Sequence, residues 1–205
     1  LVILTRRHLI TWPRLDELRG LTHALHMAKI GAAPGIGGLL YTFTFIVLAR
    51  RLALIDEASL AAFMVGQKAE AISWALLVGL GIVSGAYVGQ NLGARHEERA
   101  FAGAWLMAKI GCAIGLACSL LFCLFPDALI TAFAPGEASI LEYGRVYLFI
   151  IAVSQVFLAL EIVLEMAILG SGDTVPPMVI IAFMTLMRIP LAYGLAGPFG
   201  AAGVF

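Results

Sequence analysis

The sequence predicts an all-α, polytopic membrane protein, and its composition and apolar runs support that prediction. Of its 205 residues, 61% are hydrophobic and 13% are charged, whereas soluble domains contain about 25% charged residues. About 20 apolar residues are needed to cross the ~30 Å hydrocarbon core of a bilayer. The runs long enough are Ile30–Leu54, Ser59–Leu80, Phe101–Phe125, Leu141–Leu169 and Val175–Ala196. Basic and acidic residues balance at 13 each, and no basic stripe indicates a nucleic-acid partner.

The segment that precedes the first span, residues 1–26, is polar and contains four arginines. We expect it to form an amphipathic linker at the cytoplasmic surface, because cytoplasmic segments beside spans carry an excess of Lys and Arg. Residues 27–205 are predicted to form one transmembrane bundle. The chain begins at Leu1 rather than at a methionine, and a sixth apolar run opens at Ala201. We therefore expect a fragment whose last span is truncated.

The connections between spans set the predicted orientation. The second span continues in apolar or small residues as far as Gly89, and its glycines favour a helix that packs closely and bends. The loop at 90–99 contains Arg95 and Arg99, so we place it on the cytoplasmic side. The loop at Pro126–Ser139 contains no Lys or Arg and is placed outside.

Three glutamates lie inside predicted spans, where a charge at helix centre costs on the order of 2.5–3.5 kcal/mol. Glu161 and Glu165 are one helical turn apart and share a face, and Glu70 shares a face of the second span with Gln67. Intramembrane carboxylates usually face a water-filled path or a partner. We therefore predict that these four residues couple ion movement. For Glu165 the alternative is a bond to the loop that follows its helix.

Aromatic and hydroxyl side chains on the same spans are candidates for lining a substrate pocket. Tyr41 and Trp74 come first, because their rings suit flat, lipophilic cations and their spans also carry polar groups. Thr42 lies beside Tyr41, and Ser154 continues the helical face of Glu161. We predict that these four side chains line the pocket. We expect no metal site and no cofactor beyond a coupling ion.

Two connections have the composition of helix ends that act as hinges. At Val88–Ala94 the glycines permit a turn, and the side-chain amides can satisfy the last free carbonyls of the helix. Gly170–Thr174 stops one helix, and the following prolines open the next, where a missing N–H costs nothing. The predicted hinge residues are Gly89, Gln90, Asn91, Gly93, Gly170, Gly172, Asp173 and Pro176.

Three segments carry a family resemblance. They read GLGIVSGAYVGQNLGARHEERA at 79–100, EMAILGSGDTVPP at 165–177 and RIPLAY at 188–193. In order and separation they resemble the end of the eighth helix with its loop, the loop after the tenth helix, and part of the eleventh helix of multidrug and toxic-compound extrusion (MATE) transporters. The resemblance implies the C-terminal half of a transporter built from two six-helix bundles. It would contain five full spans and the start of a sixth, and its partner would be the N-terminal half of the same chain.

The resemblance also implies a function. A MATE transporter is a secondary active exporter of small amphipathic organic cations, in the plasma or inner membrane, that exchanges them for H⁺ or Na⁺ by alternating access. Sodium-coupled members resemble one another in having an acidic residue in the seventh helix. This chain has Tyr41 and Thr42 in that region and no carboxylate. The sodium site of those members cannot be transferred to this chain, so the coupling ion stays open.

Other functions remain as alternatives. A flippase for lipid-linked saccharides, from the same superfamily, would need a strongly cationic lumen, and the cations inside the predicted spans are Lys68, Lys109, Arg145 and Arg188. A membrane-embedded enzyme is disfavoured because the sequence contains no HExxH or GxSxG motif. A membrane subunit without transport activity is the remaining alternative, and three intramembrane carboxylates argue against it.

Overall fold

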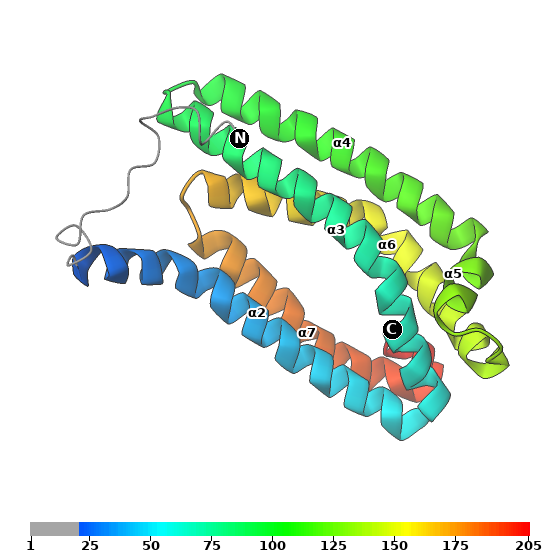
Figure 1. Cartoon of the computed structure of the whole chain (residues 1–205). Helices are drawn as coiled ribbons and strands as arrows, with labels where there is room; N and C mark the ends of the chain where they lie inside the picture. The colour runs from blue at the N-terminus through cyan, green and yellow to red at the C-terminus, as the bar shows by residue number, and fades with distance from the viewer. Residues whose placement is uncertain (1–20) are drawn as a thin grey trace.

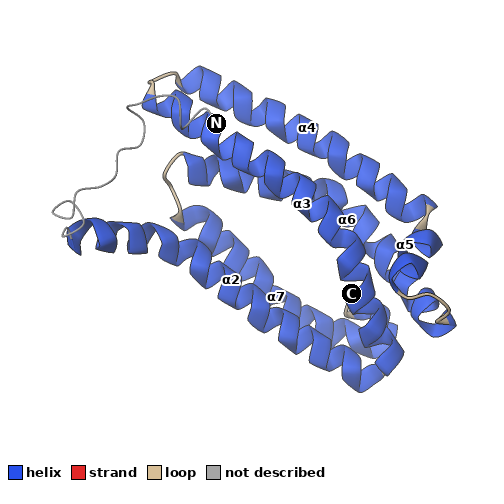
Figure 2. Cartoon of the chain, viewed as in Figure 1, coloured by secondary structure: helices blue, strands red, loops and turns tan. Residues whose placement is uncertain are grey.

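The computed structural model describes residues 21–205, which form helices joined by short connections (Figure 2). Five helices are long and apolar enough to cross a membrane, which confirms the predicted all-α membrane fold. The helices are α2 (Leu21–Ile55), α3 (Glu57–Gly93), α4 (Glu97–Leu124), α5 (Pro126–Phe133), α6 (Ala138–Gly170), α7 (Val175–Phe199) and the 3₁₀ helix η2 (Gly200–Gly203). Most of the predicted linker lies outside the described residues, and residues 21–26 already belong to α2.

Local sequence explains where the long helices begin. Acidic residues occupy the first turn of α3 (Glu57) and of α4 (Glu97 and Glu98), where a negative charge is favourable beside the free backbone N–H groups. Pro176 lies in the first turn of α7, at a position where its missing N–H removes no helical hydrogen bond. These three helices therefore start at the polar or proline-containing connections that the sequence predicts.

The helices form two groups that meet at one end (Figure 1). Helices α3, α4 and α6 pack against one another, with α5 beside α6, and α2 packs along α7. The groups are joined where α2 turns into α3, and they diverge toward the opposite end, where α3 and α6 end (Figure 1). This divergence leaves the inner faces of α2 and α7 opposite those of α3 and α6.

Glycines set the close packing of the larger group. A Cβ atom on Gly85 would lie 2.6 Å from the carbonyl oxygen of Met166, and one on Gly89 would lie 2.8 Å from that of Gly170. These glycines therefore let the backbones of α3 and α6 approach closely, as predicted. A Cβ on Gly79 would meet nothing within 4 Å, so that glycine is not required for packing.

Aromatic rings close the end where the two groups meet. The ring of Phe63 stacks on Phe45 of α2 at 5.5 Å between centroids and meets the edge of Tyr147 of α6 at 5.7 Å. Phe205 stacks on Phe63 at 6.4 Å between centroids and meets Tyr147 edge to face at 5.4 Å. Edge-to-face and offset pairs at these separations are favourable. The cluster joins α2, α3, α6 and the segment after α7.

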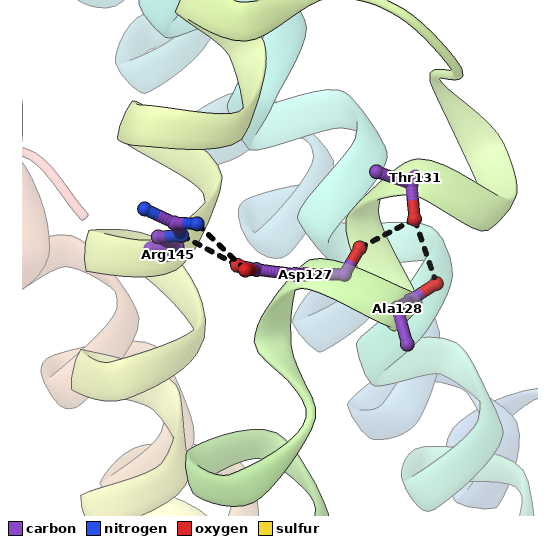
Figure 3. A network of polar contacts seen from close by, with 4 residues as sticks. All are labelled: Asp127, Ala128, Thr131 and Arg145. Carbon is purple, nitrogen blue, oxygen red and sulfur yellow. Dashed lines mark hydrogen bonds and ion pairs between the residues drawn. The ribbon is translucent and has the colours of Figure 1, made fainter.

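The predicted external loop at Pro126–Ser139 contains a helix, so its description as a simple connection is wrong. Pro126 starts α5, and the buried side chain of Ile130 packs against Gly144 of α6. Arg145 holds the same short helix through two hydrogen bonds of 2.5 and 2.6 Å to the carboxylate of Asp127 (Figure 3). Eight residues are too few for a clear periodic pattern, which is why the sequence did not indicate α5.

Acidification should loosen the contact between α5 and α6. The hydrogen bonds from Arg145 hold the pKa of the Asp127 carboxyl below its usual range, because they stabilise its charged form. A lowered pKa in the folded state stabilises the contact at neutral pH, and this contribution is lost as the pH falls below the usual range of an aspartate carboxyl and through the lowered pKa. The protection factors of the α5 amides, which correct exchange rates for their intrinsic pH dependence, should therefore be higher at neutral pH than in acid. Asp127→Asn should have low protection factors at both pH values, and equal protection factors in both proteins would contradict this role.

Residues near the end of the chain differ from the predicted start of a sixth span. Residues Gly200–Gly203 form the short helix η2, and Ala201 and Val204 are buried beside the aromatic cluster. Gly200 adopts a positive φ of 58°, a conformation that glycine accepts without steric cost. A sixth span remains a prediction from the sequence.

Candidate functional site

A cavity of about 610 Å³ lies between the two helix groups, within the size range of small-molecule sites. One end is lined by the aromatic cluster, including Phe63 and Phe205. The other end is lined by Leu169, Thr174 and Pro177, near the connection between α6 and α7. The cavity therefore runs from the joined end of the groups to their diverging end.

A hydrogen-bonded pair lies toward the joined end of the cavity. The hydroxyl of Tyr147 donates to Oε2 of Glu70 at 2.8 Å. Tyr147 is only 1% exposed, and its ring occupies the space beside Gly66, where any Cβ would collide with ring atoms. Because the ring is fixed by packing, its hydroxyl fixes the position of the Glu70 carboxylate. The site thus contains a carboxylate that is held in one orientation while still reaching the cavity.

One positive charge shares the cavity with this pair. Arg188 of α7 lines the cavity opposite α3 and α6, and Glu70 and Tyr147 line the same cavity. Within residues 21–205 it forms no ion pair, since the pair between Arg145 and Asp127 is the one found there. The guanidinium therefore influences Glu70 through the cavity and not through direct contact.

The other two carboxylates line the part of the cavity nearer its diverging end. Glu161 is exposed and Glu165 is half-buried, and both lie on α6. Gln67 of α3 also contributes to the lining. The structure therefore brings all four predicted coupling residues, Glu70, Glu161, Glu165 and Gln67, to one cavity, while their coupling role stays a prediction. Among the described residues, no three His, Cys, Asp or Glu side chains gather as a metal site would require.

Two of the four predicted substrate-lining residues reach the cavity. Tyr41 and Trp74 line it, and Thr42 and Ser154 do not. Thr42 is one residue beyond Tyr41, about 100° further around the helix, and its hydroxyl donates to the carbonyl of Gly38 at 2.9 Å. The hydroxyl of Ser154 donates to the carbonyl of Ile151 at 2.9 Å. Each hydroxyl donates to a backbone carbonyl of its own helix. The prediction that these two side chains line the pocket is therefore not confirmed.

Comparisons with known proteins decide the family. A model of the MatE family matches residues 35–194, most of the chain. This chain belongs to the MATE family. A probable multidrug resistance protein NorM from Mesorhizobium japonicum is 30% identical over 94% of this chain and 40% of its own length. A protein of the same name from Thermotoga maritima is 24% identical over 80% of this chain and 36% of its own length. The chain thus spans about two fifths of these curated relatives.

Solved structures share the fold. A transporter of the MOP superfamily from Pyrococcus furiosus, described as having a binding pocket of reverse polarity, superposes with a TM-score of 0.80 at 18% identity. The crystal structure of a MATE mutant superposes with a TM-score of 0.78 at 20% identity. Each covers 86% of this chain, which covers 39% and 40% of those chains. The MATE chain described here is a multi-pass membrane protein with half of that fold.

The predicted hinge segments have different local structures. Helix α3 continues through Gly89 to Gly93, and the residue with the left-handed conformation is Arg95, with a φ of 60°. The expectation that glycines make this turn is therefore wrong. The amide of Asn91 donates to the carbonyl of Tyr87 at 2.8 Å, one turn back inside the helix. Backbone N–H groups of the residues that follow α3 bond the last carbonyls of the helix, so the prediction that side-chain amides satisfy them is wrong. Gln90 is exposed.

The second predicted hinge segment turns at a glycine. Gly172, with a φ of 91°, makes the turn after α6, while Gly170 packs against the backbone of Gly85. Asp173 and Pro176 are exposed. The structure thus places a glycine-dependent turn at this end of α6, and the hinge function of both segments stays a prediction.

Sequence reasoning missed Tyr147 as a member of the site. Tyr147 and Glu70 are separated by 77 positions, so no spacing rule within one helix relates them. A single signal pointed to this pairing, since a tyrosine inside an apolar span needs a partner for its hydroxyl. Arg188 was recognised as an intramembrane cation, but only the packing of α7 against α2 places it on the cavity.

Proposed function

We propose that this MATE chain is the C-terminal bundle of a secondary active exporter for amphipathic organic cations. An N-terminal bundle of the same transporter would face its cavity, and H⁺ or Na⁺ influx would drive export by alternating access. The protein would act as a membrane antiporter without enzymatic chemistry. Two of its curated relatives are named as probable multidrug resistance proteins, and this supports the proposed class of cargo.

The polarity of the cavity is the observation that carries the proposal. Its lining contains three carboxylates, and Arg188 is the only positively charged residue among the described residues that form it. Apolar and aromatic side chains make up most of the rest, as in sites for drug-sized ligands. A carboxylate in apolar surroundings attracts a lipophilic cation or a proton and repels an anion.

The same polarity argues against the flippase alternative. An anionic lipid-linked saccharide would require several cations in the cavity. Lys68 and Lys109 are exposed and lie outside the lining, and Arg145 is paired with Asp127 beside α5. The positive charges within the spans therefore do not gather where such a substrate would bind. We favour an organic cation as the cargo.

The orientation of the cavity supports uptake of the cargo from the cytoplasm. The diverging end lies where α3 and α6 end (Figure 1). Arg95 lies in the connection after α3 and Arg99 in the first turn of α4, and basic residues of this kind favour the cytoplasmic side. We propose that this arrangement faces inward, that the loop at 90–99 and residues 1–26 are cytoplasmic, and that the transporter resides in the plasma or inner membrane.

Transport measurements in inside-out membrane vesicles test the proposal. Vesicles that contain the full transporter receive ethidium, a fluorescent organic cation, under an acid-inside gradient, under a sodium-inside gradient, or without a gradient. We expect ethidium to accumulate under one of the two gradients and not in its absence, which also identifies the coupling ion. Control vesicles that lack the transporter should not accumulate ethidium. Equal accumulation in both kinds of vesicle would overturn the proposed exporter function.

A further inference from the structure

Arg188 occupies an unusual position for a cation in a pocket proposed to bind cations. It lines the same cavity as Glu70, Glu161 and Glu165. Its guanidinium stays charged at every physiological pH, so loss of a proton does not remove its charge. An exporter of cations would be expected to exclude a fixed positive charge from its pocket unless that charge has a role there. Its place in one cavity with the Glu70 carboxylate indicates what the role is.

The position of Arg188 on α7 permits this side chain to move relative to Glu70. Arg188 is on α7, which packs mainly along α2, whereas Glu70 and Tyr147 belong to the group of α3 and α6. Pro190 follows two residues later inside α7, and a proline removes one helical hydrogen bond and weakens the helix locally. The long arginine side chain adds further reach. The distance between guanidinium and carboxylate can therefore change without disrupting either group of helices.

An uncompensated carboxylate within a membrane is costly. The Glu70 carboxylate has the Tyr147 hydroxyl as its hydrogen-bond donor, and Arg188 in the same cavity carries the opposite charge. A proton, a sodium ion or a cationic cargo would supply the same charge when it arrives. Two cations cannot both remain close to one carboxylate without repelling each other. The arriving cation and Arg188 thus compete for Glu70.

We propose that Arg188 is a tethered competitor for the cation site at Glu70. It balances the Glu70 carboxylate while the cavity is empty and yields it to the coupling ion or to a monovalent organic cation. This inference rests on the proposed function of the site and assigns a role to one further residue. Competition from a tethered charge weakens binding and so speeds release, which an exporter needs in each cycle.

Binding of tetraphenylphosphonium to the purified full transporter tests the competition. We compare the dissociation constant for wild type, Arg188→Gln, Arg188→Lys and Lys109→Gln. Removing an opposite charge near a carboxylate changes its affinity for a cation by about tenfold or more. Arg188→Gln should therefore bind about tenfold more tightly, and Arg188→Lys should resemble wild type because the charge is kept. Lys109 is exposed on α4 outside the lining, so its substitution removes a charge without affecting binding.

A second measurement does not depend on organic cargo. Dicyclohexylcarbodiimide modifies protonated carboxyl groups in apolar surroundings, and mass spectrometry reports the modification of Glu70. Without the competing charge the proton is held more firmly, so Glu70 of Arg188→Gln should remain reactive to a pH about one unit higher than in wild type. The other polar groups that face this region are Gln67 of α3, Tyr147, Glu161 and Glu165 of α6, and Tyr41 of α2. All of them are unchanged in the comparison.

The possible outcomes are distinct. Tighter binding together with a higher pH limit of labelling supports the competition. Unchanged values in Arg188→Gln, or weaker binding by that variant, overturn it. If wild type and all variants fail to bind tetraphenylphosphonium, the proposed cargo class fails, and the labelling experiment then decides the role of Arg188 alone. Thermal melting of each variant identifies any loss of folding, and Arg188→Lys provides the folded comparison.

Discussion

Replacing Glu70 by Gln in the full transporter should reduce ion-driven export of ethidium to no more than about a tenth of the wild-type rate, because intramembrane carboxylates of this kind act as ion and proton relays. Glutamine keeps the size of the side chain and can still accept the hydrogen bond from Tyr147, which is 2.8 Å long in the native site. It cannot take up or release a proton, nor hold a cation by charge. Uptake into inside-out vesicles under the effective gradient measures the change.

The matched control for this substitution is Glu137→Gln. Glu137 is exposed ahead of α6 and outside the cavity lining, so its substitution removes a carboxylate without touching the site. We expect its transport rate to equal that of wild type. Wild-type coupling in Glu70→Gln, with normal expression, would remove Glu70 from the mechanism.

Gly85→Ala should destabilise the bundle. Among the glycines of α3 that are exposed or half-exposed, Gly85 should show the largest loss of stability on replacement by alanine. The added Cβ would lie 2.6 Å from the carbonyl oxygen of Met166, and a backbone atom in a packed helix cannot move aside as a flexible side chain can. Overpacking of this kind lowers the free energy of unfolding by about 1–3 kcal/mol. Thermal or denaturant unfolding in detergent measures the loss.

Gly79→Ala is the internal control, six positions earlier on the same helix. A Cβ there would meet nothing within 4 Å. Alanine is favoured over glycine inside a helix by roughly 0.8–1.0 kcal/mol, so this variant should be as stable as wild type or slightly more so. If both variants unfold alike, close contact between the backbones of α3 and α6 does not explain the glycines of this span.

The spans were predictable because hydrocarbon demands a long apolar run whatever packs around it. Each predicted run falls in one long helix, except that Phe125 directly follows α4, and α2 begins nine residues before the first predicted run. Helix α5 was not predictable, because its stability comes from Ile130 against Gly144 and from the pair between Asp127 and Arg145. Those contacts bring together two segments whose sequences show no local sign of the pairing.

The site was predictable only in part, for the same reason. Spacing within one helix identified the faces that carry Glu70 with Gln67 and Glu161 with Glu165, and both faces line the cavity. It could not show that Ser154 would direct its hydroxyl to its own helix. It also could not reveal partners on other helices, such as Tyr147 and Arg188, whose positions depend on how the two helix groups pack.

The proposed transport mechanism requires that the inner faces of the two helix groups border a water-filled path, and thiol accessibility tests this requirement most directly. Ala71 lines the cavity, whereas its neighbour Ile72 is 55% exposed and lies outside the lining. Each is replaced by cysteine in a full transporter whose native Cys112, Cys118 and Cys123 are changed to alanine. A charged, membrane-impermeant thiosulfonate is then applied from the cytoplasmic side, since such reagents need a hydrated, ionised thiol. We predict rapid modification of Ala71→Cys and none of Ile72→Cys, whereas equal reactivity, or reaction of Ile72→Cys alone, would contradict a water-filled cavity between the groups.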